Sequence, residues 1–175
     1  MTLAVDPVFS LLALTALALL FASAALAKLR DRERFAAILE AYQVLPSGLV
    51  RPAAVMLPFI ELAVALGLFV TQLRLGALAA AAGLLFIYAS AIALNLARGR
   101  RDIDCGCEGF GRRRPIAGWM LVRNGFLMAI AVVAAAPPVP RALQLVDVLT
   151  IAGGLAAFVL IYVAADELFT PRRLA

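Results

Sequence analysis

The composition of this 175-residue chain excludes a soluble globular domain, because 65% of its residues are hydrophobic, 15% are charged and the mean hydropathy is +1.00. Soluble domains have about 45 to 50% apolar and about 25% charged residues. The net charge of +5 is therefore expected to orient a membrane protein in lipid, with no nucleic acid as partner. Without histidine, and with two cysteines, the chain has no ligands for a His-held haem, a His-ligated zinc or a four-Cys site, so no metal is expected.

The first apolar run covers residues 7–27 and is long enough to cross about 30 Å of hydrocarbon. Ala25-Leu26-Ala27 resembles a signal-peptide cleavage site, but no Lys or Arg precedes the run, and it exceeds the usual apolar core of about 7 to 15 residues. We therefore expect a retained membrane anchor. Residues 28–52 carry charges first and then apolar side chains at helical spacing, which predicts an interfacial amphipathic helix.

Four further apolar runs follow along the chain. They cover residues 53–70, 75–96, 116–136 and 146–165. The second and third spans must be antiparallel neighbours, because only four residues separate them. Small residues such as Gly67 and Gly76 favour close helix approach. The predicted fold is an all-α, polytopic transmembrane helix bundle, in which residues 1–175 form a single integral membrane domain with four core spans and a fifth, peripheral C-terminal span.

The distribution of Lys and Arg over the loops predicts an orientation. Thirteen of the sixteen lie in the loop after the first span, the loop after the third span or the C-terminal tail. The opposite side has only Arg74 and Arg141, and Arg123 lies inside the fourth span. Cytoplasmic loops carry the excess of basic residues. We therefore expect the N-terminus outside and the C-terminus inside.

Two cysteines form the strongest local signal, because residues 104–109 read Asp-Cys-Gly-Cys-Glu-Gly. A disulfide between Cys105 and Cys107 would close a small, strained ring, which suits a bond that is made and broken in exchange. Neighbouring arginines favour the thiolate, whereas Asp104 and Glu108 oppose it. The alternatives are inert loop thiols, half of a metal site completed by another chain, and a basic loop that only sets topology. Cys105 and Cys107 are the candidate catalytic residues.

Polar residues inside the predicted spans form the second candidate site. Glu61 lies near the middle of the second span, and Arg123 and Asn124 lie about two turns inside the fourth. Intramembrane ionisable groups are costly and usually paired. A Glu61–Arg123 pair would lock the helices together, or the three residues would line a proton relay or a pocket for a quinone head group; alternatively, Arg123 extends toward the loop side. Four aromatic residues near span ends are interpreted as interface anchors. These are Tyr42, Tyr88, Trp119 and Tyr162.

The chain resembles the MauE family of methylamine utilisation proteins, within the wider DoxX-like membrane proteins. The matching strings are Lys-Leu-Arg-Asp at 28–31 with Phe35, Tyr-Gln-Val-Leu-Pro at 42–46, Leu57-Pro58 with Glu61-Leu62 and Gly67, Asn-Leu-Ala-Arg-Gly-Arg at 95–100, Ile-Asp-Cys-Gly-Cys at 103–107, Gly109, Pro115-Ile116, and Arg123-Asn124. The sequence departs from the pattern at Glu108, where an aromatic residue is more usual, and in the three arginines at 112–114.

The resemblance implies a multi-pass protein of the bacterial inner membrane that aids processing, transport or disulfide formation of the methylamine dehydrogenase small subunit, with a thioredoxin-like partner of the MauD type. It assigns Cys105 and Cys107 to the family's cysteine pair, Glu61 to its second-span glutamate, and Arg123 with Asn124 to its fourth-span polar pair. We expect a component of a thiol–disulfide oxidoreductase. One conflict stays open, since an exported enzyme needs thiols outside and the charge count places them inside.

Three alternatives remain beside that reading. The first is a non-redox membrane chaperone or export subunit, for which the cysteines are only structural. The second is a quinone-linked membrane oxidoreductase subunit of the DoxX-like kind, with the quinone near Glu61 and Arg123. The third is a small-solute permease with Glu61 as the coupling carboxylate, which lacks an inverted repeat in this sequence.

Overall fold

The computed structural model describes residues 5–106 and 115–169, and the helices below are those of this part of the chain. They are α1 (Pro7–Arg30), α2 (Arg32–Tyr42), α3 (Ser47–Gly67), α4 (Arg74–Ala97), α5 (Trp119–Ala134) and α6 (Leu145–Phe169). Four of them, α1, α3, α4 and α6, are long and apolar enough to cross a membrane. The expected all-α, polytopic bundle is confirmed, and the protein is a multi-pass membrane protein.

Helix α1 begins with Pro7 directly after Asp6, whose carboxylate accepts a hydrogen bond from the Val8 N–H at 2.9 Å. The helix continues to Arg30, three residues beyond the predicted end of the first span. Asp31 then separates α1 from α2 and caps α2 by accepting a hydrogen bond from the Arg34 N–H at 3.0 Å. The charged residues after the first span are therefore helical on both sides of this break.

The predicted interfacial segment is shorter than expected, because α3 begins at Ser47 and not at residue 53. Pro46 occupies the N-cap position, where its missing N–H costs no helical hydrogen bond. Helices α3 and α4 form the expected hairpin. At its closed end, a Cβ added to Gly67 would lie 3.2 Å from the Ala77 Cβ. The close approach predicted for small residues is confirmed at Gly67, whereas Gly76 faces open space.

Helix α5 has 16 residues and is shorter than the predicted span 116–136. Its N-terminal flank is extended, because the Ile116 N–H donates to the Ile103 carbonyl at 2.9 Å and Asp104 pairs with Pro115 in an isolated bridge. Sixteen helical residues rise about 24 Å, less than the hydrocarbon thickness. Among the described residues, α5 is thus a shorter apolar helix beside the four long ones.

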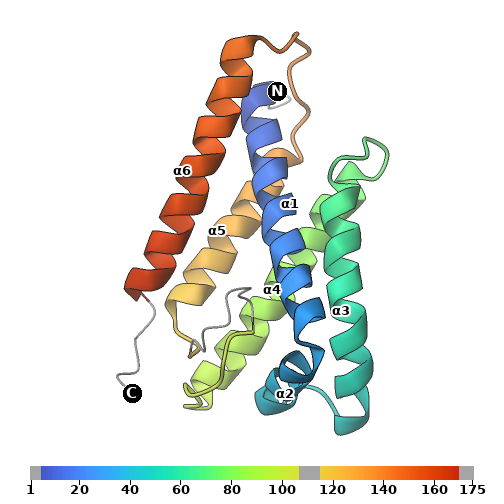
Figure 1. Cartoon of the computed structure of the whole chain (residues 1–175), viewed down its shortest axis with the longest axis vertical. Coiled ribbons are helices and arrows are strands. Elements are labelled where there is room, and N and C mark those ends of the chain that lie inside the picture. Colours follow the sequence, from blue (N-terminus) through green and yellow to red (C-terminus); the bar gives the residue numbers. More distant parts are fainter. Residues whose placement is uncertain (1–4, 107–114, 170–175) are drawn as a thin grey trace.

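The core lies between α1, α3, α4 and α5, with α1 at the centre of the bundle (Figure 1). Its largest fully buried side chains include Leu14, Leu17 and Phe21 of α1 and Leu127 of α5. Helix α6 lies along one side of the bundle, against α1 and α5, and its apolar side chains are mostly exposed. This agrees with the expected peripheral place of the fifth span.

Candidate functional site: a buried charge cluster and a cysteine turn

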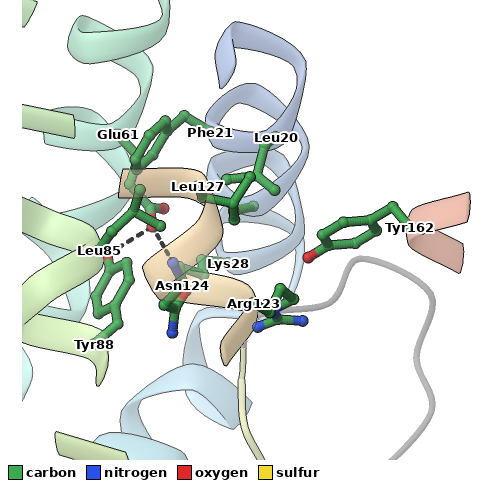
Figure 2. Close-up of a pocket in the computed structure, with 11 residues that line it drawn as sticks. Leu20, Phe21, Lys28, Glu61, Leu85, Tyr88, Arg123, Asn124, Leu127 and Tyr162 are labelled. Carbon is green, nitrogen blue, oxygen red and sulfur yellow. Dashed lines mark hydrogen bonds and ion pairs between the residues drawn. The ribbon is translucent and has the colours of Figure 1, made fainter. Parts of the chain in front are cut away.

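A buried ion pair joins three helices in the middle of the bundle. Lys28 of α1 is 4% exposed and Glu61 of α3 is fully buried, and the Lys28 ammonium pairs with the Glu61 Oε1. The Tyr88 hydroxyl of α4 donates to the same oxygen at 2.6 Å (Figure 2). The Lys28 Nζ also lies 5.2 Å from the ring centre of Phe35 and 5.0 Å from that of Tyr88. Both rings add cation–π attraction to the pair.

Lys28 reaches this site because α1 extends past the apolar run. Residues seven apart share a helix face. Leu14, Phe21 and Lys28 follow this spacing, and all three are buried. Lys28 therefore continues the core face of α1. The interpretation of Lys28 as a loop charge is wrong, because Lys28 is a buried residue of α1.

Arg123 and Asn124 line the same cavity as Lys28 and Glu61, so the structure brings the three predicted residues of this site together. The predicted Glu61–Arg123 pair is nevertheless wrong, because the ion pair of Glu61 is with Lys28. The Arg123 guanidinium carbon lies 5.5 Å from the ring centre of Tyr162 on α6. Arg123 of α5 thus contacts α6, whereas Lys28 and Glu61 pair between α1 and α3.

The cavity has a volume of about 30 Å³, which holds about two water molecules. Glu61 Oε2 and Asn124 Nδ2 are among the buried polar atoms of its lining residues that have no hydrogen-bond partner among the described residues. A carboxylate acceptor and an amide donor are the partners that a water molecule needs. Drug-sized ligands occupy pockets of about 300 to 1,000 Å³. The cavity as it stands has room for water and not for a ligand of that size.

The first cysteine lies at the end of the described part of the loop after α4. Cys105 is 8% exposed and packs among Tyr42, Ile92 and Met120. Its backbone carbonyl lies 3.5 Å from the Tyr42 hydroxyl, which donates a long hydrogen bond. Cys107, the second cysteine of the predicted pair, lies outside the described residues.

Residues on both sides of Cys105 shape a tight turn. The Asp104 Oδ2 pairs with the Arg34 guanidinium at 2.7 Å, and its Oδ1 accepts a hydrogen bond from the Gly106 N–H at 3.3 Å. Gly106 has a φ of +68°, and a Cβ at this position would lie 3.0 Å from the Ile38 Cγ2. The left-handed conformation and the close contact both require glycine. Packing against Ile38 of α2 therefore favours glycine at this position between the two cysteines.

The string 95–100 builds the connection between α4 and α2. Helix α4 ends in a left-handed turn at Gly99, whose N–H donates to the Leu96 carbonyl while the Arg100 N–H donates to the Asn95 carbonyl, each at 3.0 Å. The turn directs the Arg100 guanidinium to the Ala41 carbonyl at 2.8 Å.

Asn95 is fully buried, and its amide donates to the Tyr42 carbonyl at 3.1 Å. Asn95 and Arg100 therefore cap the C-terminal carbonyls of α2.

Sequence reasoning missed four residues of these two sites. They are Lys28, Arg34, Tyr88 and Arg100. The anchor interpretation is wrong for Tyr42, which is buried at 7% exposure, and for Tyr88, which binds Glu61. Seven-residue spacing on α1 was the available signal for Lys28, and the four-residue spacing of Arg34, Ile38 and Tyr42 was the signal for α2. Within 5–106 and 115–169, no three Cys, Asp or Glu side chains gather in a metal-binding group.

Comparison with known proteins identifies the family. The family model described as "Methylamine utilisation protein MauE" matches residues 6–137, which excludes α6. Proteins named methylamine utilization protein MauE are similar to this chain. The one from Paracoccus denitrificans is 47% identical over 115 residues, 66% of this chain and 62% of its own length. The one from Methylophilus methylotrophus is 37% identical over 167 residues, 92% of this chain and 86% of its own length.

A third relative, from Methylorubrum extorquens, is 37% identical over 131 residues, 75% of this chain and 70% of its own length. No solved structure matches this chain. The family match covers α1 to α5 and therefore includes the buried charge cluster and the cysteine turn. The chain belongs to the MauE family of methylamine utilisation proteins.

Proposed function

We propose that this protein is a membrane thiol-redox maturation factor of methylamine utilisation. In this role Cys105 and Cys107 exchange with a thioredoxin-like protein of the MauD type and support disulfide formation, processing or transport of the methylamine dehydrogenase small subunit. The supporting observation is the built turn around Cys105, which holds the residue between a carbonyl contact, an ion pair and a left-handed glycine. A loop thiol without a role in exchange would not need these contacts.

The chemistry is thiol–disulfide exchange. A thiolate of one protein attacks a disulfide sulfur of the other, a mixed disulfide forms, and the second thiol of the attacking protein releases it. In each complete exchange one disulfide is reduced and one dithiol is oxidised, and two electrons and two protons pass between the cysteine pair and its partner. The partner supplies the co-reactant, so the exchange requires no resident metal or quinone.

The test is a Cys107→Ser variant in cells that contain the partner. We expect a mixed disulfide through Cys105 on a non-reducing gel after acid quenching, because the resolving thiol is gone. The matched control is Cys105→Ser with Cys107→Ser, which cannot form it. An unchanged redox state of the partner in both variants would contradict the proposal. Full maturation of the dehydrogenase with the double variant would favour a non-redox chaperone or export subunit.

The orientation is a second part of the proposal. Six arginines lie at the end of α1, in α2 and in the segment after α4, namely Arg30, Arg32, Arg34, Arg98, Arg100 and Arg101. This basic excess supports a bacterial inner-membrane protein with this end in the cytoplasm, the N-terminus outside and the C-terminus inside. The test is labelling of intact cells with a membrane-impermeant thiol reagent after reduction. Protection until lysis supports this orientation. Labelling of intact cells would reverse it and favour direct oxidation of an exported subunit.

A further inference from the structure

One face of α2 holds the cysteine turn. Arg34, Ile38 and Tyr42 are four residues apart and therefore lie along one side of the helix. Each contacts a different residue of the turn: the Arg34 guanidinium pairs with Asp104, the Ile38 side chain packs on Gly106, and the Tyr42 hydroxyl reaches the Cys105 carbonyl. Helix α2 is thus the element against which the backbone of the turn is set.

The ion pair has a direct effect on the environment of the thiol. Asp104 precedes Cys105, and an unneutralised carboxylate beside a thiol disfavours the thiolate. Arg34 lies on the Asp104 carboxylate at 2.7 Å, with side chains 32% and 18% exposed. Partial burial reduces solvent screening of this pair relative to a surface pair. Arg34 therefore offsets the charge of Asp104 at the position where a thiolate would form.

Helix α2 is itself fixed at its far end. Arg100 and Asn95 bind the carbonyls of Ala41 and Tyr42, so the C-terminal turn of α2 is fastened to α4 next to the residue that contacts Cys105. Helix α2 thus links residues 95–100 and 103–106 into one structural unit.

We propose that α2 is the positioning element of the exchange reaction, with Arg34 and Tyr42 as positioning residues for Cys105. This inference rests on the proposed function. In the step concerned, the Cys105 thiol gives its proton to water, the thiolate attacks one sulfur of the partner's disulfide, and that disulfide breaks as the mixed disulfide forms. The expelled partner thiolate then takes up a proton. Arg34 favours the first event, and Tyr42 holds the backbone from which the sulfur projects.

The charged groups that surround the described part of the turn come from three elements. Helix α2 contributes Arg34, the end of α4 contributes Arg100, and the turn itself contributes Arg101, Asp102 and Asp104. Helix α5 contributes the uncharged Met120. Tyr42 is the other titratable side chain in contact with the turn, through its hydroxyl 3.5 Å from the Cys105 carbonyl oxygen.

The experiment measures the alkylation rate of Cys105 by a small haloacetamide between pH 6 and 10, in membranes carrying a Cys107→Ala background. Arg34→Gln is expected to slow alkylation about threefold to tenfold below the thiol pKa and to leave the rate above it unchanged, because only the thiolate fraction falls. Asp104→Asn added to Arg34→Gln should restore the rate. Arg32→Gln is the matched control, because Arg32 is an exposed neighbour on the same helix; it should leave the profile unchanged.

Tyr42 is tested by two variants in the same assay. Tyr42→Phe should change the rate less than twofold, because the hydrogen bond at 3.5 Å is long and weak. Tyr42→Ala should change it at every pH, because it removes the buried ring that packs on Cys105.

Three results would overturn the inference about Arg34. The first is an unchanged pH profile in Arg34→Gln. The second is a slowing by the same factor at every pH, and the third is a slowing that Asp104→Asn does not reverse, because either of these would mean that Arg34 only supports the local fold. A Tyr42→Ala rate equal to the wild-type rate would remove Tyr42 from the positioning role. The assay needs no partner, so absence of a mixed disulfide with Cys107→Ser would contradict the proposed function while leaving this result intact.

Discussion

Helices α1 and α6 have the same hydropathy and opposite burial. Their most apolar stretches both have a mean hydropathy of 2.3, but 44% of the stretch in α1 is buried and 0% of that in α6. Hydropathy therefore identifies a membrane span without saying what the span packs against. Helix α1 contributes several fully buried side chains and the buried Lys28 to the core, whereas α6 packs on it through the partly buried Phe158 and Tyr162 and leaves most of its apolar side chains exposed.

The contacts that hold the two helices differ in the same way. Lys28 ties α1 to Glu61 and Tyr88 inside the bundle. Helix α6 is held by an exposed clamp, in which Arg141 pairs with Asp6 at 3.1 Å and with Asp147 at 2.7 Å. Buried charges become costly when one partner is removed, whereas exposed pairs contribute little. Substitutions are therefore expected to lower the free energy of unfolding much more in α1 than in α6.

The largest effect is expected from Lys28→Met, which leaves the Glu61 carboxylate buried without its cation. Breaking a buried pair in this way typically costs about 3 to 5 kcal/mol. Adding Glu61→Gln should recover most of the loss, because no uncompensated charge then remains. Unfolding in bicelles measures both variants, with the exposed Arg30→Met as control. A loss no larger than that of Arg30→Met would contradict the burial of the pair.

A matched pair of leucines compares the two helices directly. Leu14 of α1 is 1% exposed and Leu160 of α6 is 70% exposed. Leu14→Ala should lower the free energy of unfolding by about 2 to 5 kcal/mol, because it leaves a cavity in the core. Leu160→Ala should change it by less than about 0.5 kcal/mol, since its side chain faces lipid. Equal losses in the same unfolding assay would show that α6 is packed in the core.

Two glycines are expected to respond with opposite sign. In Gly67→Ala the new Cβ would lie 3.2 Å from the Ala77 Cβ, which cannot move without its helix, so the α3–α4 hairpin should be destabilised by about 1 kcal/mol or more. In Gly154→Ala the nearest atom is the Leu12 Cδ2 at 3.1 Å, at the end of a flexible side chain. The gain in helix propensity, up to about 1 kcal/mol, should then make this variant neutral or more stable. Thermal unfolding of both variants measures the sign.

The smallest effect is expected at the clamp. The hydrogen bonds from the Arg141 guanidinium and from the Val8 N–H lower the pKa of Asp6 below its ordinary value of 3.8. A lowered carboxyl pKa stabilises the folded protein above the ordinary value, and the contribution disappears as the pH falls through the lower folded value. Arg141→Gln should therefore leave the melting temperature at pH 7 nearly unchanged. The difference in melting temperature between the wild type and Arg141→Gln should disappear as the pH falls through the lowered pKa of Asp6; a difference that grows with acidity would contradict this assignment.

The sequence predicted the parts of the fold that depend on local composition. Apolar runs located the spans within a few residues, and Gly67 indicated the close approach of α3 and α4. The partner of Glu61 was not predictable in the same way, because it depends on how far α1 continues and on which face it turns inward. From the sequence, Arg123 was the better candidate for the partner of Glu61, because it lies within an apolar run, whereas Lys28 lies at the end of one. Lys28 is the partner of Glu61 because α1 continues past the apolar run and presents the Lys28 side chain to the core.

The cysteine site shows the same limit. The residue types of the string 104–109 indicated exchange chemistry, and the string itself has a glycine between the two cysteines. It did not indicate α2 as the support, because the contacts of Arg34, Ile38 and Tyr42 join residues about 60 to 70 positions apart in the chain. Such contacts are set by packing of the whole bundle and have no local pattern beyond four-residue spacing.

The measurement that tests the central claim most directly is the redox state of Cys105 and Cys107 in cells, read by acid quenching and a membrane-permeant alkylating reagent before and after reduction. It is made in strains with and without the gene for the thioredoxin-like partner. The proposal predicts that part of the pair is labelled only after reduction and that this oxidised fraction changes when the partner is absent. Complete labelling without reduction in both strains would show that the pair does not cycle and would contradict the proposed exchange.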